Sequence, residues 1–330
     1  MIIRQTMRAA FIRATGGIDQ IEVGELPVPR PGPTDVLVRM EASEVNHVDL
    51  FVRSGAYRTH TPFPFVIGRD LVGTVIEAGS GVASLEAGDR VWCNSLGHHG
   101  RQGAFAEFAV VAEDRLYPLP TGVDSKQAVS LVHTAATAHI GLVREAKLQA
   151  GETIFVEGGG GGVGSSVVQM ASAMGARVIA TATPEEHSWV EGLGADAVFD
   201  YRLPDLYARV HEEGANGIDV WWDTSGHNRF AQCLPLLAMG GRVVIASGLM
   251  GSDPILPVGA MYTNEVTLRG FAISNASIDD LARAARSING HLTRGRLHGR
   301  VGAVFRLSEA AKAHAAMASG TVRGRIVVVP

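Results

Sequence analysis

The pattern of hydrophobic and polar positions changes character twice along the 330 residues. Up to about residue 120, short runs of β-branched and aromatic residues lie between glycine and proline turns, which is typical of strands. The segment PVPRPGPTD (27–35) is a proline-rich turn. We expect strands at VLVRMEASEV (36–45), LVGTVIEAG (71–79), RVWCNSL (90–96) and AFAEFAVVAEDRLYPLP (104–120).

The middle of the chain alternates between strand and helix patterns. Strand–helix alternation at this spacing predicts a parallel, doubly wound sheet. One helix is expected from near Asp124, with Gln127 placed for a capping box. The expected strands are 153–158, 177–182, 197–201, 219–226 and 242–248. The other expected helices are 163–174, 185–193, 205–213 and 228–239.

The last part of the chain returns to a mixed pattern. The length suits two domains of ordinary size. We predict an α/β protein in which the doubly wound domain occupies residues 123–262, between a β-rich part at 1–122 and a mixed part at 263–330. The elements expected in the last part are helices near 277–290 and 308–318 and a closing strand at 324–330.

A run of five glycines, with a sixth after Val163, lies between an expected strand and an expected helix. Within it, Gly159-x-Gly161-x-x-Gly164 fits the dinucleotide fingerprint, in which glycine permits a tight turn and close approach to a pyrophosphate. The helix N-terminus then offers N–H donors to the phosphates. A flexible linker is the alternative, but linkers do not lie inside such a unit. The predicted cofactor-binding residues here are Gly159, Gly161, Gly162, Val163 and Gly164.

The end of the second expected strand bears on the choice of cofactor. NAD-binding folds usually place an acid there for the ribose 2′-hydroxyl. This strand ends Thr181-Ala182-Thr183, and small hydroxyls accept a 2′-phosphate that an acid would repel, so Thr181 and Thr183 favour NADP. Glu185 and Glu186 follow at once. They either oppose the phosphate or serve only as charges at a helix N-terminus, which leaves NAD as the alternative.

Composition narrows the class of protein. The net charge is −4, without a basic block of the kind that binds nucleic acid or membrane surfaces. No run of about 18 apolar residues predicts a membrane span, and the N-terminal sequence lacks a signal-peptide pattern. Cys93 and Cys233 suit a reducing compartment and exclude a four-cysteine zinc site. We expect a cytoplasmic protein that acts on a small molecule, without nucleic-acid or membrane partners.

Six segments carry a family resemblance: VNHVDLFVRSGAY (45–57), PFPFVIGRDLVGTVIEAG (62–79), GDRVW (88–92), GAFAEFAVV (103–111), GGVGSSVVQMASAMGARVIAT (161–181) and GADAVFDYR (194–202). They resemble the zinc-independent quinone oxidoreductases, including the zeta-crystallin type, of the medium-chain dehydrogenase/reductase superfamily. The resemblance implies a GroES-like catalytic domain made from both ends of the chain, with a Rossmann domain between them. It also implies NADPH and a homodimer.

Zinc-dependent alcohol dehydrogenases of that superfamily hold a catalytic metal with Cys, His and Cys. The matching positions here are Asn46, Arg69 and His133. Asparagine is a poor zinc ligand and arginine is none, whereas a catalytic zinc needs three protein ligands. Val48 stands where the alcohol-to-zinc proton relay has Ser or Thr. We therefore expect no zinc, and hydride transfer from NADPH to a quinone or an α,β-unsaturated carbonyl.

The three candidate catalytic residues each have a second interpretation. The Asn46 amide either hydrogen-bonds substrate or ribose, or caps the helix that follows. Arg69 either orients the substrate or pairs with a carboxylate such as Asp70. His133 is either a donor suited to neutral pH or a core histidine. The Gly- and His-rich loop 96–105 is either a lid or a solvated loop.

The resemblance also implies further cofactor contacts. Tyr201 and Arg202 would lie at the adenosine end, although they also fit a surface pair. Ser247 and Gly248 end a strand of the doubly wound domain, and Phe271 lies in a segment that covers the nicotinamide carboxamide. Two other functions stay open: a metal-free alcohol dehydrogenase or ketone reductase, and a protein that binds NADPH without turnover.

Overall fold

The computed structural model describes residues 4–251 and 253–330, which form two compact units. The first unit contains the chain up to His133 together with Leu281–Pro330, and the second is Thr134–Asp280. Both boundaries lie later than the expected 122/123 and 262/263. The first falls within a helix, and the second moves because Thr267–Gly270 adds a strand to the parallel sheet.

The first unit is built on two sheets. The larger has the order β15-β16-β3-β5-β6-β8, with β7 paired to β3, and the smaller has the order β2-β1-β4. The strands of this unit are β1 (Thr6–Ile12), β2 (Glu22–Pro27), β3 (Asp35–Val45), β4 (Phe65–Val66), β5 (Asp70–Ala78), β6 (Arg90–Cys93), β7 (Phe108–Ala112), β8 (Tyr117–Pro118), β15 (Val301–Arg306) and β16 (Arg325–Val329).

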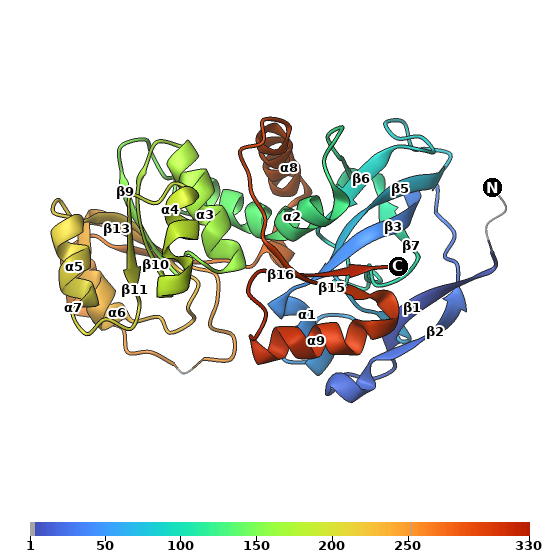
Figure 1. Cartoon of the computed structure of the whole chain (residues 1–330), viewed down its shortest axis with the longest axis horizontal. Coiled ribbons are helices and arrows are strands. Elements are labelled where there is room, and N and C mark those ends of the chain that lie inside the picture. Colours follow the sequence, from blue (N-terminus) through green and yellow to red (C-terminus); the bar gives the residue numbers. More distant parts are fainter. Residues whose placement is uncertain (1–3, 252) are drawn as a thin grey trace. The chain divides into compact units, whose positions relative to one another are not determined.

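The two ends of the chain meet in the larger sheet. Strand β16 pairs antiparallel with β3, with Ile326 opposite Val45 and Val327 opposite Glu44; Figure 1 shows the red C-terminal strand beside the blue β3. Apolar side chains of both segments share one core, which helix α9 (Ala310–Ser319) covers. This pairing carries residues of the last segment to the start of helix α1 (His47–Ser54).

The single strand expected at 104–120 is wrong. It divides into β7 and the two-residue β8, which a 3₁₀ turn at Glu113–Arg115 separates. Pro118 and Pro120 lack the N–H that a strand ladder needs, so the pairing ends there. Strand β6 also stops at Cys93 rather than residue 96.

The second unit is the predicted doubly wound domain. Its six strands are all parallel, in the order β11-β10-β9-β12-β13-β14. This is the Rossmann order, whose direction reverses between β9 and β12, so a ligand is expected at the carboxyl ends of those strands. The strands are β9 (Thr153–Glu157), β10 (Arg177–Ala182), β11 (Ala197–Asp200), β12 (Ile218–Asp223), β13 (Leu237–Ile245) and β14 (Thr267–Gly270).

Most expected helices are present with shifted ends. Helix α2 is preceded by Asp124, whose Oδ1 accepts the N–H groups of Lys126 and Gln127, each at 3.0 Å. No helix within the described ranges is long and apolar enough to cross a membrane. The helices not yet given are α2 (Ser125–Ile140), α3 (Gly162–Ala173), α4 (His187–Gly192), α5 (Leu206–Glu213), α6 (Phe230–Cys233), α7 (Val258–Thr263) and α8 (Ile278–Thr293).

The helix expected at 228–239 is wrong. Helix α6 ends at Cys233, a 3₁₀ turn follows, and β13 has already begun at Leu237. Pro235 lies in that turn and cannot continue an α-helix. Gly240 then adopts a left-handed φ of 74°, within the stretch where the register between β12 and β13 shifts. The strand is therefore longer at its start than the sequence pattern indicates.

Candidate active site

The glycine run forms a turn that is bonded to the neighbouring strand. The N–H of Gly158 donates to Thr181 Oγ1 at 3.0 Å, and the N–H of Gly159 donates to the Thr181 carbonyl at 2.7 Å. The N–H of Gly161 closes the turn on the Gly158 carbonyl at 3.0 Å. Helix α3 begins directly afterwards, at Gly162. The N–H groups of its first turn have no partner within the helix and face its N-terminal end.

The glycines of the fingerprint have different tasks. A Cβ on Gly164 would overlap the Gly158 carbonyl oxygen, and a Cβ on Gly159 would lie 2.9 Å from the Ala180 Cβ. Packing therefore requires both glycines. A Cβ on Gly161 would meet only the Gly158 oxygen, at 3.3 Å, and φ there is −74°, which any residue adopts. The space beside Gly161 is what a pyrophosphate at a helix N-terminus needs.

The environment of Thr181 differs from the expectation that its hydroxyl would receive a phosphate. The residue is 2% exposed, and its hydroxyl already accepts the Gly158 N–H. Thr181 therefore shapes the turn. Thr183 lies at the start of the next turn, where its hydroxyl donates to Glu186 Oε2 at 3.3 Å.

Glu186 has a position that the sequence did not reveal. A Cβ built on Gly160 would overlap Glu186 Oε2, so this carboxylate lies directly against the glycine turn. Glu186 is thus more than a charge at a helix N-terminus. An acid beside the turn is suited to a ribose hydroxyl and unfavourable for a 2′-phosphate.

Tyr201 and Arg202 form the surface arrangement that was one of their two interpretations. Arg202 Nε and Nη2 donate to both oxygens of Asp200, at distances between 2.9 and 3.2 Å. Its guanidinium lies 5.6 Å from the ring centroid of Tyr201, which is 48% exposed. Asp200 ends β11 beside the end of β10. The positive charge of Arg202 is therefore largely compensated by a carboxylate.

The remaining predicted cofactor contacts follow β13 and β14. Ser247 Oγ donates to the carbonyl of Asp223, at the end of β12, at 3.4 Å. Gly248 has a φ of 109°, which favours glycine. The N–H of Phe271 donates to the Ile245 carbonyl at 3.2 Å, so this amide is engaged within the sheet.

The first unit contains a cluster of buried polar side chains, which we call the polar cluster: Glu44, Asn46, Asp49, Arg69, Asp70, His133 and the half-buried Arg325. Asp70 lies at its centre. Its Oδ2 accepts a hydrogen bond from the Asn46 amide, and its Oδ1 lies 3.2 Å from Nδ1 of His133. One carboxylate therefore joins two of the three residues predicted to be catalytic.

Asn46 occupies the capping position that was one of its two interpretations. It precedes helix α1, and its backbone N–H donates to Asp49 Oδ2 at 2.7 Å. Its side chain bonds in two directions, because Nδ2 donates to Asp70 while Oδ1 accepts from Arg325 Nη2 at 2.6 Å. Arg325 also forms an ion pair with Glu44. The amide of Asn46 is thus engaged within the protein at both ends.

Charge in the polar cluster is concentrated and shielded from water. Arg69 is 1% exposed, and Asp49 and Asp70 are the carboxylates that offset the burial of its guanidinium. Burial, with a contribution from Asp70, raises the pKa of Asp49 to about 7. Burial likewise raises the pKa of Glu44. Sequence reasoning missed Glu44, Asp49 and Arg325, and it considered Asp70 only as a partner for Arg69.

The loop 96–105 is exposed to solvent only in its middle, at residues 99–102. Its first three residues and its last three are buried, and His98 packs its ring 3.9 Å from that of His99 and 5.7 Å from that of Tyr57. Burial, with the positive charge of Arg69, lowers the pKa of His98 to about 4. This histidine is therefore neutral at physiological pH.

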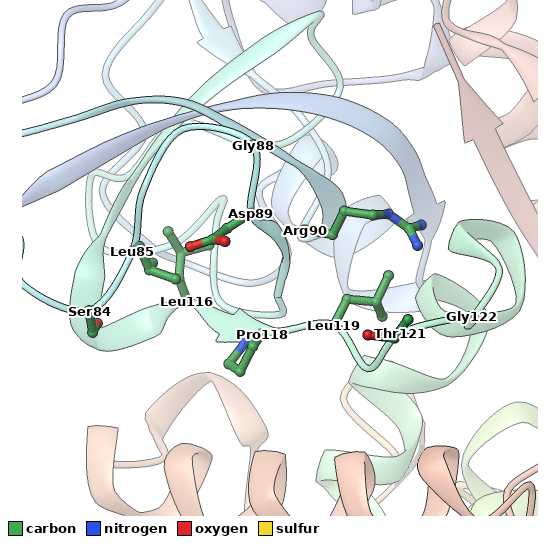
Figure 2. Close-up of a pocket in the computed structure, with 10 residues that line it drawn as sticks. All are labelled: Ser84, Leu85, Gly88, Asp89, Arg90, Leu116, Pro118, Leu119, Thr121 and Gly122. Atoms are coloured by element: carbon green, nitrogen blue, oxygen red, sulfur yellow. The ribbon is translucent and has the colours of Figure 1, made fainter.

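A pocket of about 510 Å³ lies elsewhere in the first unit, lined by residues of 84–90 and 116–122 (Figure 2). None of these residues belongs to the polar cluster. The charge of Arg90 is already used, because its Nη2 donates to Glu41 Oε2 at 3.0 Å and to Ser125 Oγ at 2.7 Å. We therefore do not assign the chemistry to this pocket.

Two family models match the chain. Residues 32–121 match the alcohol dehydrogenase GroES-like domain, and residues 162–289 match the zinc-binding dehydrogenase family. These matches confirm the expected GroES-like and Rossmann parts.

Relatives extend along the whole chain. The quinone oxidoreductase of Rattus norvegicus is 31% identical over 94% of each chain. Two solved structures are similar over 98% of this chain and all of theirs. One is an NAD-dependent alcohol dehydrogenase, with a TM-score of 0.90 and 32% identity, and the other is a mycobacterial protein complexed with NADPH, with 0.87 and 29%. The chain belongs to the medium-chain dehydrogenase/reductase superfamily, and the quinone oxidoreductases are related to it along its whole length.

Proposed function

We propose that this oxidoreductase uses NADPH to reduce a quinone or an α,β-unsaturated carbonyl, without a metal. The observation that carries the proposal is the polar cluster, at the positions where zinc-dependent relatives hold their metal. A catalytic zinc needs three protein ligands. Here Asn46 uses both ends of its amide on Asp70 and Arg325, and Arg69 adds a positive charge. These residues do not fit a zinc ion.

The second unit has a suitable cradle for the cofactor. The glycine turn and the N-terminus of α3 would hold the pyrophosphate, and the bound nicotinamide would supply a hydride. NADPH is favoured because β10 itself ends without an acid and because a similar mycobacterial structure carries NADPH. Glu186 opposes this preference, so we expect the margin over NADH to be narrow.

The polar cluster would supply the donor that such a reaction needs. Hydride addition to a quinone or enone leaves an oxyanion, and a single well-placed donor is worth about 10²–10³ in turnover. Asn46 is an unsuitable donor because its Nδ2 is bonded to Asp70. Arg69 and His133 are the remaining candidates of the three. With Val48 in place of a hydroxyl, a simple alcohol has no relay for its proton.

We propose a homodimer as the working form. Several large apolar side chains of the second unit are exposed between Met239 and Tyr262, and β14, which follows them in the chain, is an edge strand. Such patches commonly mark contact surfaces. The exposed apolar residues of this stretch are Met239, Leu249, Met250, Ile255, Val258 and Tyr262.

We also propose that the protein acts in the cytoplasm. Its two buried free thiols, Cys93 and Cys233, fit a reducing compartment.

A metal-free alcohol dehydrogenase or ketone reductase is the second candidate. It is favoured by the contact between His133 and Asp70, which would suit proton exchange with an alcohol, and by the similarity to a structure named as an NAD-dependent alcohol dehydrogenase. A third possibility is binding of NADPH without turnover.

One assay separates the three. The purified protein is given NADPH or NADH with a panel of quinones, enones and ketones, and the oxidised cofactors with simple alcohols, before and after treatment with a chelator. We expect reduction of quinones or enones that survives the chelator, and negligible alcohol oxidation. Faster oxidation of alcohols, or loss of activity together with one bound zinc per chain, would overturn the proposal. Cofactor binding without any turnover would support the third possibility.

A further inference from the structure

Asp70 is the most enclosed acid that contacts a candidate catalytic residue. Its side chain is 0% exposed, and its backbone is fixed separately: it pairs with Glu44 across β3 and β5, and its carbonyl accepts Ser43 Oγ at 2.5 Å. The carboxylate is therefore not needed to hold the strand in place. A buried carboxylate is costly unless donors surround it, so its retention calls for a function in its contacts.

The two oxygens of Asp70 face different partners. Oδ2 accepts from the Asn46 amide, which Arg325 holds from its other end. This fixes the carboxylate so that Oδ1 faces His133 Nδ1 at 3.2 Å. A carboxylate at that distance favours a proton on Nδ1 and holds the ring in one orientation. The acidic proton for transfer then belongs on the other ring nitrogen, Nε2.

The difference in burial indicates which of the two side chains can face a substrate. Asp70 is fully enclosed, whereas His133 is 7% exposed, the highest value among the buried members of the polar cluster.

We propose that Asp70 is a positioning residue that holds His133 as the proton donor of the reduction. The inference rests on the proposed function. As a hydride forms a new C–H bond on the substrate, the π electrons of the conjugated C=C and C=O bonds shift so that a negative charge develops on the carbonyl oxygen. His133 Nε2 gives its proton to that oxygen, and the imidazole is later reprotonated from water. The quinone or enone gains a hydride and a proton, and the nicotinamide is oxidised.

The test is a double-mutant cycle on the full-length protein. Asp70→Asn keeps the shape but removes the charge, and His133→Gln removes the donor. We expect Asp70→Asn to lower kcat by about 10–100-fold while the KM for NADPH changes less than about twofold. The double variant should be no slower than His133→Gln alone, because Asp70 acts through His133. Ser43→Ala, which removes a bond to the Asp70 backbone only, should keep kcat near that of the wild type.

A second measurement does not depend on turnover. The ring-nitrogen NMR signals of His133, assigned by their loss in His133→Gln, should shift in Asp70→Asn and remain in place in Ser43→Ala. An active wild type with full kcat in Asp70→Asn, or with losses that multiply in the double variant, overturns the inference while the proposed function stands. If the wild type reduces no quinone or enone, the proposed function fails, and unchanged His133 signals in Asp70→Asn would then disprove the pair itself.

Discussion

The two units build their candidate sites by opposite means. In the second unit, the glycine turn offers backbone groups, and its shape depends on the absence of side chains at Gly159 and Gly164. In the first unit, the polar cluster offers side chains only, and these come from segments as distant as Asn46 and Arg325. The turn is formed within a few residues of chain, whereas the cluster exists only after β16 has paired with β3.

This difference has consequences for substitution. A backbone site fails when an added atom occupies space, and the damage stays local unless the atom meets another backbone group. A buried charged network fails when one member is removed, because the charges of the others lose their compensation. The same kind of mutation should therefore act through packing in one unit and through electrostatics in the other.

The largest effect is expected at Gly164. Gly164→Val should abolish cofactor binding and lower the thermal stability of the second unit, because its Cβ overlaps the Gly158 carbonyl, which cannot move away easily. Gly161→Val should also prevent binding, but with little loss of stability, because only one contact at 3.3 Å is affected. Calorimetric titration with NADPH and thermal unfolding measure both quantities. Normal binding by either variant would show that the fingerprint register is wrong.

The next effect concerns Arg69. Arg69→Ala should lower the free energy of unfolding by about 3–5 kcal/mol, because it leaves Asp49 and Asp70 buried without this cation. Arg202→Ala is the matched control. Arg202 makes a two-pronged ion pair with Asp200, but its side chain is 56% exposed, so its loss should cost at most about 1 kcal/mol. Equal midpoints for the two variants in urea would show that the polar cluster is not electrostatically strained in this way.

The same contrast explains how much the sequence predicts. The doubly wound domain follows from local alternation of patterns, and the strand 177–182 is found at its expected residues. The failures occur where proline or glycine breaks a pattern that hydrophobicity alone continues, as at Pro235 and Gly240. The boundary near residue 280 was missed because β14 joins the sheet through pairing with β13 rather than through any local signal.

For the candidate site, the sequence predicts residue types better than roles. The glycine turn is where the fingerprint places it, because its geometry is local. Thr181 was expected to face a phosphate, but its hydroxyl holds the turn. The roles of Asp70 and Arg325 depend on strands far apart in the chain, so no spacing reveals them. Glu186 lies against the glycine turn because it belongs to the 3₁₀ turn (Pro184–Glu186) that follows β10, and no sequence pattern indicates that approach.

A smaller effect is expected for a buried carboxyl group of the second unit. Glu157 ends β9, and burial, with Asp223 nearby, raises its pKa to about 7. A raised pKa means that the folded state favours the neutral acid. The resulting contribution to folding stability is complete below the ordinary pKa of a carboxyl group and is lost as the pH rises through about 7. Glu157→Gln should therefore stabilise the protein by about 1–3 kcal/mol near pH 8 and much less near pH 5.

Thermal unfolding at the two pH values measures this effect. Glu212→Gln serves as the control, because Glu212 lies on the exposed surface of α5 in the same unit. Its melting temperature should change little at either pH. A gain for Glu157→Gln that is the same at both values would mean that its carboxylate is not destabilised by burial.

The smallest effect concerns the choice between NADPH and NADH, because the side chain of Glu186 lies against the glycine turn. Glu186 Oε2 lies against Gly160, so its negative charge would oppose the 2′-phosphate of NADPH and could bind the ribose hydroxyl of NADH. Glu186→Gln should therefore tighten NADPH binding by about tenfold and leave NADH unchanged or weaker. Glu185→Gln, at the preceding position, should change the ratio of the two dissociation constants far less. Titration of both cofactors at two salt concentrations measures the ratio, and the gain for NADPH should shrink as salt screens the charge. An equal gain for both cofactors would mean that Glu186 acts on the pyrophosphate they share, and no gain for either would remove it from the site.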